Sequence, residues 1–362
     1  MADINNARKI INEIDTQMAK LFEKRMDAAK EVAQYKKERG LPILDESRER
    51  EIIDKNSQLI KNEEYKPYYV SFLKKNMSLS KKLQHRLING TRVAYSGVKG
   101  AFANIAAEKI FPDADTVPYP DFRSAYEAVE KGECDLAVLP VENSFNGDVG
   151  QVMDLAYFGS LYINGIYDIS VVHNLLAKKG TKLSDIKTVI SHPQALGQCQ
   201  KIIEKYVFET IEAENTAVAA KLLAESQRND IAAIASSEAA EEFNLKTLLS
   251  HINDSNMNTT RFAVFSSARK NPDPIDKRFV LLFTVSNEAG ALANAVSAIG
   301  NGGFNLKALK SRPTKELIWD YYFYAEGEGN INSENGKQMI KELEKCCSTV
   351  KVVGSFEKDI VL

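Results

Sequence analysis

A heptad stripe of apolar side chains, interrupted by a single cation, dominates the start of the chain. Neither Gly nor Pro occurs from Asp3 to Lys37, so the pattern predicts one long helix. The stripe, called the α-stripe below, consists of Ile4, Ala7, Ile11, Ile14, Met18, Leu21, Arg25, Ala28, Val32 and Tyr35. An unpaired guanidinium on such a face is costly, so Arg25 requires an anionic partner. That partner is either a glutamate on another helix or a bound anion.

Two further cations flank the α-stripe. Lys36 lies roughly 16 Å from Arg25 along a helix, so the two long side chains can converge on one small ligand. Arg8 lies roughly 25 Å from Arg25 on the same scale, too far for both to hold that ligand within one chain. A shared site would therefore need Arg8 from a partner subunit.

Two shorter helices follow. Pro42 ends the first helix, and Asp45 has the character of an N-cap for a second. A third helix is predicted over residues 67–87, where Ser80 and Gln84 lie one turn apart beside the apolar face. Three helices of uneven length make a poor core for one chain, which favours a dimer.

Residues 1–88 resemble the all-helical chorismate mutase domain. The residues that carry the resemblance are, in order, Arg8, Arg25, Lys36, Asp45, Arg48, Glu49, Ser80 and Gln84. The resemblance implies that the first helices of two chains intertwine and that each site borrows an arginine from the partner. The implied reaction is the rearrangement of chorismate to prephenate, which needs a fixed conformer and stabilised negative charge on the breaking ether oxygen.

The same resemblance implies residue roles. Arginines hold the two carboxylates, Lys36 and Gln84 donate hydrogen bonds to the ether oxygen, and Glu49 receives the ring hydroxyl. Asp45 and Arg48 orient the second helix, and Ser80 contacts a carboxylate.

Composition limits the number of domains and the kinds of partner that the chain can have. The chain has 362 residues, 44% of them hydrophobic, and a formal net charge of −2, which fits two or three ordinary domains and disfavours nucleic acid as the main partner. A polar start predicts no signal peptide, and no apolar run approaches the ~18 residues of a membrane span. Neither the four cysteines nor the four histidines show metal or disulfide spacing. We therefore expect a cytoplasmic protein without metal, cofactor or membrane contact.

After Asn89 the periodicity changes to short strands alternating with helices. A strand over 92–95 enters a glycine turn, and a helix over 122–131 leads into an apolar strand over 136–139. A similar arrangement recurs later, with a helix over 217–226 and a strand over 230–234. The repetition predicts two α/β lobes with a cleft between them.

Three polar loops are predicted at strand ends, where open α/β sheets bind their ligands. They cover residues 140–144, 191–194 and 258–262. Each has a plain structural explanation by itself. Asn143 and Ser144 are turn formers, Ser191 can cap a helix that begins at Pro193, and Thr260 is a common strand residue.

Together these loops resemble prephenate dehydratase over residues 91–268, which implies a two-lobed fold like that of periplasmic binding proteins. The implied reaction removes the ring hydroxyl and carbon dioxide from prephenate to give phenylpyruvate. Thr260 is the residue we expect to contact that hydroxyl, while Arg261 either holds a carboxylate or forms a structural ion pair. Asn104 stands where several relatives carry a histidine or an acid. The expected polar rim consists of Glu142, Asn143, Ser144, Ser191, His192 and Gln194.

A charged, proline-containing linker over 269–277 precedes a third region, residues 277–358. Its predicted order of strand, helix, strand, strand, helix and strand gives a ferredoxin-like sandwich. The region resembles the ACT regulatory domain, whose two motifs bind phenylalanine in dehydratases. Here they read Gly290, Ala291, Leu292 and Lys310, Ser311, Arg312, Pro313, with Asn305 between them.

Lys310 replaces the glutamate of the second motif, so we expect weaker feedback by phenylalanine. A helix N-terminus can still hold the carboxylate of the effector. Gly290 by itself could equally be a plain helix start.

The sequence therefore predicts a homodimeric or larger bifunctional chorismate mutase and prephenate dehydratase of phenylalanine biosynthesis. Two alternatives stay open: an amino-acid sensor with decayed catalytic sites, and a dehydratase that prefers arogenate.

Overall fold

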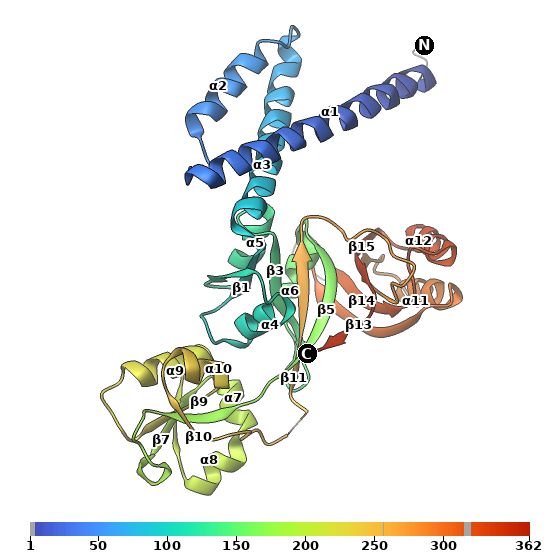
Figure 1. Ribbon diagram of the computed structural model, residues 1–362. Helices are drawn as coiled ribbons and strands as arrows, with labels where there is room; N and C mark the ends of the chain where they lie inside the picture. Colours follow the sequence, from blue (N-terminus) through green and yellow to red (C-terminus); the bar gives the residue numbers. More distant parts are fainter. Residues whose placement is uncertain (1–3, 256, 315–319) are drawn as a thin grey trace. The chain divides into compact units, whose positions relative to one another are not determined.

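The structure, a computed structural model, describes residues 4–255, 257–314 and 320–362 (Figure 1). It divides into two compact units, Met1–Arg92 and Val93–Leu362. Within the described residues, no helix combines the length and the apolar content needed to span a lipid bilayer.

The first unit is helical, as predicted. It contains α1 (Ile4–Arg39), α2 (Glu46–Ser57), the short turn η1 (Glu63–Tyr65) and α3 (Lys66–Asn89). Asp45 caps α2 by accepting a hydrogen bond from the backbone N–H of Arg48 at 3.0 Å. Gly90 ends α3 with a φ of 78°, a conformation that glycine adopts without strain.

The α-stripe forms a helix but not a core within one chain. Only Ala29 and Ala33 of α1 are buried, and both lie in its C-terminal half. Ile4 is 60% exposed, Ile11 55% and Leu21 64%. A row of exposed aliphatic side chains of this length is typical of a surface that another chain covers.

The first lobe of the second unit is built on a seven-stranded sheet. The strand order is β16-β5-β11-β3-β1-β2, with β4 paired to β3. The strands are β1 (Arg92–Ser96), β2 (Asp115–Tyr119), β3 (Leu136–Asn143), β4 (Gly147–Asp148), β5 (Tyr162–Ser170), β11 (Thr259–Ser266) and β16 (Ile360–Val361). Its helices are α4 (Phe102–Ile110), α5 (Phe122–Lys131) and α6 (Gly150–Phe158).

The second lobe is inserted between β5 and β11, so the chain crosses between the lobes twice. Its sheet has the order β10-β6-β9-β7-β8. The elements are β6 (Asn174–Ala177), η2 (Leu183–Asp185), β7 (Thr188–Ser191), α7 (Pro193–Gln198), α8 (Gln200–Tyr206), β8 (Glu209–Glu212), α9 (Thr216–Glu225), β9 (Ile231–Ala235), α10 (Ser237–Glu242) and β10 (Lys246–Leu249). The two predicted lobes are therefore present.

Two segments predicted as loops are strand ends instead. β3 continues to Asn143 and β11 already begins at Thr259, and the two strands pair antiparallel. Thr260 lies opposite Asn143, and Arg261 lies opposite Glu142. Their turn-forming residues suggested loops, but β11 is also paired with β5 on its other side, which holds it extended.

The C-terminal region has the predicted order of four strands and two helices. These are β12 (Arg278–Thr284), α11 (Ala291–Asn301), β13 (Asn305–Pro313), β14 (Tyr321–Glu328), α12 (Glu334–Cys346) and β15 (Thr349–Phe356). The sheet order is β13-β14-β12-β15, with all pairs antiparallel. Trp319, the predicted start of the third strand, lies outside the described residues.

The C-terminal sheet has two covered faces. Phe279, Leu281 and Phe283 of β12 pack in one core with residues of α11 and α12. Val280 and Leu282, which alternate with them, share a core with the first lobe. The chain then returns to that lobe, because β16 pairs parallel with β5. The boundary predicted at residue 358 therefore leaves out a strand of the first lobe's sheet.

Candidate functional site

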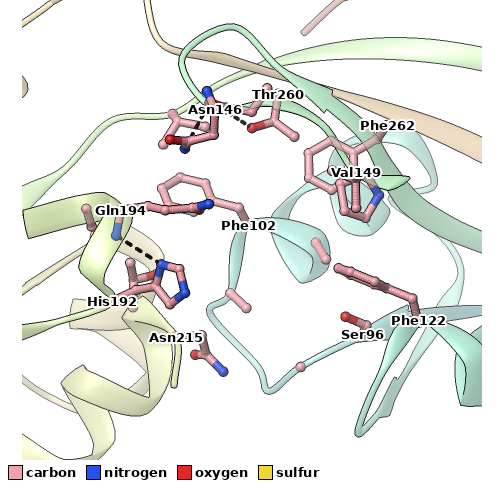
Figure 2. A pocket seen from close by; sticks show the side chains of 18 of the residues that line it. Ser96, Phe102, Phe122, Asn146, Val149, His192, Gln194, Asn215, Thr260 and Phe262 are labelled. Atoms are coloured by element: carbon pink, nitrogen blue, oxygen red, sulfur yellow. Dashed lines mark hydrogen bonds between the residues drawn. The ribbon is translucent and has the colours of Figure 1, made fainter. Parts of the chain in front are cut away.

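A cavity of about 650 Å³ lies between the two lobes of the second unit (Figure 2). Residues of the first turn of α4, α5, α6 and α9 line it, together with the start of α7 and the neighbouring ends of β3 and β11. Several helix N-termini thus lie around one space. Asp121, His192 and Asn215 accept backbone N–H groups in the first turns of α5, α7 and α9, whereas the N-termini of α4 and α6 have no side-chain cap and suit an anion. Among the described residues that line the cavity, none is a lysine or an arginine.

Thr260 lies in this cavity with a fixed hydrogen-bond partner (Figure 2). The side-chain oxygen of Asn143 accepts the backbone N–H groups of Phe145 and Asn146, each at 3.0 Å, which fixes the orientation of the amide. Asn143 Nδ2 therefore donates to Thr260 Oγ1 at 2.9 Å. Because the threonine oxygen accepts from Asn143, its own proton is free to be donated to a ligand.

Three buried polar side chains extend this arrangement, and the sequence analysis missed them. Asn143 Nδ2 also donates to Asn258 Oδ1 at 3.0 Å, and Asn258 Nδ2 donates to Gln198 Oε1 at 2.8 Å. His173 Nε2 lies 2.9 Å from the same Gln198 oxygen. Asn258 begins the third predicted loop, but the sequence gives it no role of its own. No spacing in the sequence links His173 to Gln198.

His192 and Gln194 line the cavity, as expected (Figure 2). The His192 side chain accepts the backbone N–H of Gln194 at 3.3 Å and so caps α7. Burial lowers the pKa of His192, which favours its neutral form at neutral pH.

Ser144 and Ser191 do not line the cavity, which corrects the predicted rim. Ser191 is fully buried, and its hydroxyl donates to the backbone oxygen of Ile234 at 2.6 Å, which joins β7 to β9. Ser144 donates to the backbone oxygen of Met257 at 2.9 Å. Asn104 is also buried, and its oxygen accepts the backbone N–H of Gly100 at 2.9 Å. All three are held by backbone partners.

Glu142 and Arg261 alternate with Asn143 and Thr260, and they also lie outside the cavity lining. Arg261 pairs with Glu142 at 3.1 Å and with Glu326 of β14 at 2.8 Å. Burial by itself would lower the pKa of Arg261, but the charges and hydrogen bonds of Glu326, Glu142 and Asp359 together outweigh it and raise the pKa. Of the two alternatives for Arg261, the structure shows the structural ion pair.

Lys310 joins the same cluster. Its ammonium lies 2.8 Å from a carboxylate oxygen of Glu142 and also contacts Asp148. Burial opposes ionisation of Glu142, yet hydrogen bonds from Lys310 and Arg261 hold its pKa below the ordinary value. We call Glu142, Asp148, Arg261, Lys310 and Glu326 the charge cluster. It connects β13 and β14 of the C-terminal sheet to β3 and β11.

The other residues predicted to bind the effector lie on β13 or at the start of α11. Arg312 pairs with Asp154 of α6 at 2.8 Å, so its guanidinium joins the C-terminal sheet to the first lobe. Gly290 precedes α11 with a φ of 87°, and Asn305 Nδ2 donates to Glu328 at 2.9 Å. Ser311 and Pro313 lie in β13 on either side of Arg312. Ala291 and Leu292 open α11.

The first unit brings some of its predicted residues together. Arg25 donates to the backbone oxygen of Asn76 at 3.1 Å and contacts the Ser80 hydroxyl. In the part of the chain that the structure describes, Arg25 forms no salt bridge, so the proposed glutamate partner is not found. One turn after Ser80, Gln84 is buried and its side-chain oxygen has no hydrogen-bond donor among the described residues.

The remaining predicted residues of this unit have partners of their own. Lys36 donates to the backbone oxygen of Ile43 at 2.6 Å, and Glu49 pairs with Lys81 at 2.7 Å. Arg48 pairs with Glu51 on an exposed surface, and Arg8 is exposed on α1.

Comparisons with known proteins separate the same two regions. The family described as chorismate mutase type II matches residues 7–85, and the family described as prephenate dehydratase matches residues 93–270. The chain is 32% identical to the bifunctional chorismate mutase/prephenate dehydratase of Aquifex aeolicus, over 100% of this chain and 99% of that protein. The chain belongs to this bifunctional family.

Two further relatives resemble the dehydratase part. Arogenate dehydratase/prephenate dehydratase 2 of Arabidopsis thaliana is 34% identical over 78% of this chain and 77% of that protein. The crystal structure of prephenate dehydratase from Arthrobacter aurescens in complex with L-Phe has a TM-score of 0.69 and 26% identity, over 74% of this chain and 90% of that chain.

The geometry around Thr260 gives a direct test. Thr260→Ala should lower dehydratase turnover by about a hundredfold or more, whereas Thr260→Ser should keep part of it, because serine retains the hydroxyl that Asn143 leaves free to donate. Thr259→Ala is the matched control, since its side chain alternates to the other face of β11. Phenylpyruvate formation from prephenate measures the effect, and full activity of the alanine variant would remove Thr260 from the site.

Proposed function

We propose that the cavity between the two lobes is the dehydratase site and that Thr260 contacts the ring hydroxyl of prephenate. The bifunctional enzyme converts chorismate to prephenate, and prephenate to phenylpyruvate by decarboxylation and dehydration, in the biosynthesis of phenylalanine. The hydrogen bond from Asn143 to Thr260 carries the proposal, because it leaves the threonine proton free for the leaving oxygen.

The weak acidity of the Thr260 hydroxyl limits its part in the dehydration. The hydroxyl leaves as water only if a proton reaches it, and a threonine is too weak an acid to supply that proton unaided. Thr260 therefore orients the hydroxyl and relays a proton. Helix N-termini rather than cationic side chains face the carboxylates of prephenate, since no lysine or arginine occurs in the described lining. One carboxylate can then depart as neutral carbon dioxide without breaking an ion pair.

We propose prephenate rather than arogenate as the preferred substrate. Arogenate carries an ammonium group, which requires an acidic partner. Of the three acidic side chains in the described lining, Asp121 caps α5 and Asp148 contacts Lys310. This leaves the exposed Glu214 to meet an ammonium, and an exposed carboxylate contributes little.

The substrate preference is tested by comparing kcat/KM for the two compounds with the same purified enzyme. We expect the value for prephenate to exceed that for arogenate by about tenfold or more, the effect of one unmatched charge. Equal or higher values for arogenate would contradict the assignment.

For the first unit we propose a mutase site shared by two chains. The exposed apolar residues of α1 lack a cover within one chain, and a second α1 of the same sequence fits them. Arg25, Ser80 and Gln84 form the part of the site that one chain supplies, with Lys36, Asp45, Arg48 and Glu49 around it. Arg8 reaches the site of the partner chain. The inward Arg25 and the unsatisfied oxygen of Gln84 are both consistent with a polar ligand there.

A mixing experiment tests the shared site. Arg8→Ala and Arg25→Ala should each lower mutase activity by about thirtyfold or more, because each removes a charge-assisted contact worth roughly 2–4 kcal/mol of transition-state stabilisation. After the two impaired proteins are mixed and their subunits have exchanged, activity should recover, since one site per mixed dimer holds both arginines. Dehydratase activity on supplied prephenate is the internal control. Exchange without recovery would exclude the geometry.

We propose that the C-terminal region is an ACT regulatory domain with a ferredoxin-like fold that binds phenylalanine. The relative from Arthrobacter aurescens is described as a complex with L-Phe. Here Gly290, Ala291 and Leu292 present the N-terminus of an eleven-residue helix, and Asn305 begins the adjoining strand β13. Ser311, Arg312 and Pro313 follow on the same strand.

The contacts of Lys310 change what its replacement should do. If Lys310 weakens feedback only because it replaces the glutamate of the motif, Lys310→Glu strengthens inhibition. In the structure this substitution would place a third carboxylate beside Glu142 and Asp148 and would loosen β13 from β3. We now expect Lys310→Glu to raise the phenylalanine concentration for half-inhibition by about fivefold or more. Lys310→Met, which only removes the charge, should have a smaller effect. Titration of phenylalanine against dehydratase rate distinguishes these outcomes, and stronger inhibition would restore the original expectation.

A further inference from the structure

His173 is a buried histidine with no part in the chemistry described so far. It is 2% exposed and lines the cavity just before β6, where the chain first crosses from one lobe to the other. Its backbone N–H donates to Asn253 Oδ1 at 2.7 Å, and its ring makes an edge contact with Phe102. Asn258 is linked to His173 by two hydrogen bonds through Gln198. It lies where the chain crosses between the lobes for the second time.

The hydrogen bonds determine the tautomer of His173. The backbone N–H groups of residues 145 and 146 make Asn143 Nδ2 a donor, so Asn258 must accept through Oδ1 and donate through Nδ2. Gln198 consequently accepts from Asn258 through Oε1. The ring nitrogen 2.9 Å from that same oxygen is therefore a donor, so His173 carries its proton on Nε2.

Packing does not explain why this position holds a histidine. The other ring nitrogen, Nδ1, is buried and has no hydrogen-bond partner among the described residues. An acceptor in that situation destabilises the folded state relative to an apolar side chain of similar size. Burial lowers the pKa of His173, so the ring is neutral and donates through Nε2 alone.

We propose that His173 is a positioning residue of the dehydratase site. The side-chain oxygen of Gln198 accepts hydrogen bonds from His173 Nε2–H and from Asn258. The amide nitrogen of Gln198 is therefore left to face the cavity, which Gln198 lines. The same chain of hydrogen bonds continues through Asn258 to Asn143, which donates to Thr260. His173 acts through Gln198 and does not itself contact the reacting atoms. The inference rests on the proposed role of Thr260.

A matched pair of variants tests this role. His173→Gln can place a donor near the position of Nε2, whereas His173→Met has nearly the same length and shape but no donor. We expect the Gln variant to stay within about threefold of wild type and the Met variant to lose about tenfold in kcat, the effect of one hydrogen bond. KM should change less than kcat. Thermal unfolding, measured on the same proteins, reports damage to the fold.

A double-mutant cycle with Gln198→Met separates positioning from general support. If His173 acts through Gln198, adding His173→Met to Gln198→Met should lower kcat by less than twofold. Additive losses would overturn the proposal, as would equal kcat for the Gln and Met variants or unfolding of both. Full activity of Thr260→Ala would instead remove the proposed role of Thr260, so the two failures are distinguishable.

Discussion

The antiparallel pairing of β3 with β11 is the constraint on which the dehydratase unit depends. The pairing sets Thr260 opposite Asn143 and, one residue along, Arg261 opposite Glu142. Side chains alternate between the faces of a sheet, so this one register directs a hydroxyl and an amide into the cavity and two charges away from it. A slip by one residue would exchange the two sets. On the opposite face of the sheet, Arg261 pairs with Glu326 and Glu142 pairs with Lys310, both from the C-terminal sheet. These ion pairs stabilise the same register.

The helical unit depends on a different constraint, the shortage of partners for its longest helix. α1 buries only two alanines within its own chain, although its sequence repeats apolar residues over most of its length. The polar residues of the candidate mutase site lie near its C-terminal half, where α3 supplies Asn76 and Ser80. The two activities of the chain therefore have opposite requirements: one site is enclosed within a single chain, and the other is proposed to need two.

Local signals predicted most of the architecture. The Asp45 cap, the α-stripe and the alternation of short strands with helices predicted the elements, and the residue order at Thr260 predicted the cavity. The errors concern contacts that only the tertiary structure decides. Glu142 and Ser191 were expected in the rim, but Glu142 pairs with Lys310 from a distant strand, and Ser191 is bound to a neighbouring backbone oxygen. Likewise His173 and Gln198 come together because the chain crosses between the lobes, which no local pattern records.

The position of β16 has a consequence for how the chain is synthesised. The first lobe's sheet takes strands from residues 92–170, then β11 after the inserted lobe, and finally β16 at residues 360–361. A ribosome releases the chain from its N-terminal end, so this sheet cannot be complete before residues 360–361 have been made, whereas the last helix of the first unit ends at Asn89. Until then β5 presents an open edge, to which a second nascent chain could add a strand. The mutase unit can thus fold and associate early, and the dehydratase sheet is completed only after residue 361 has been made.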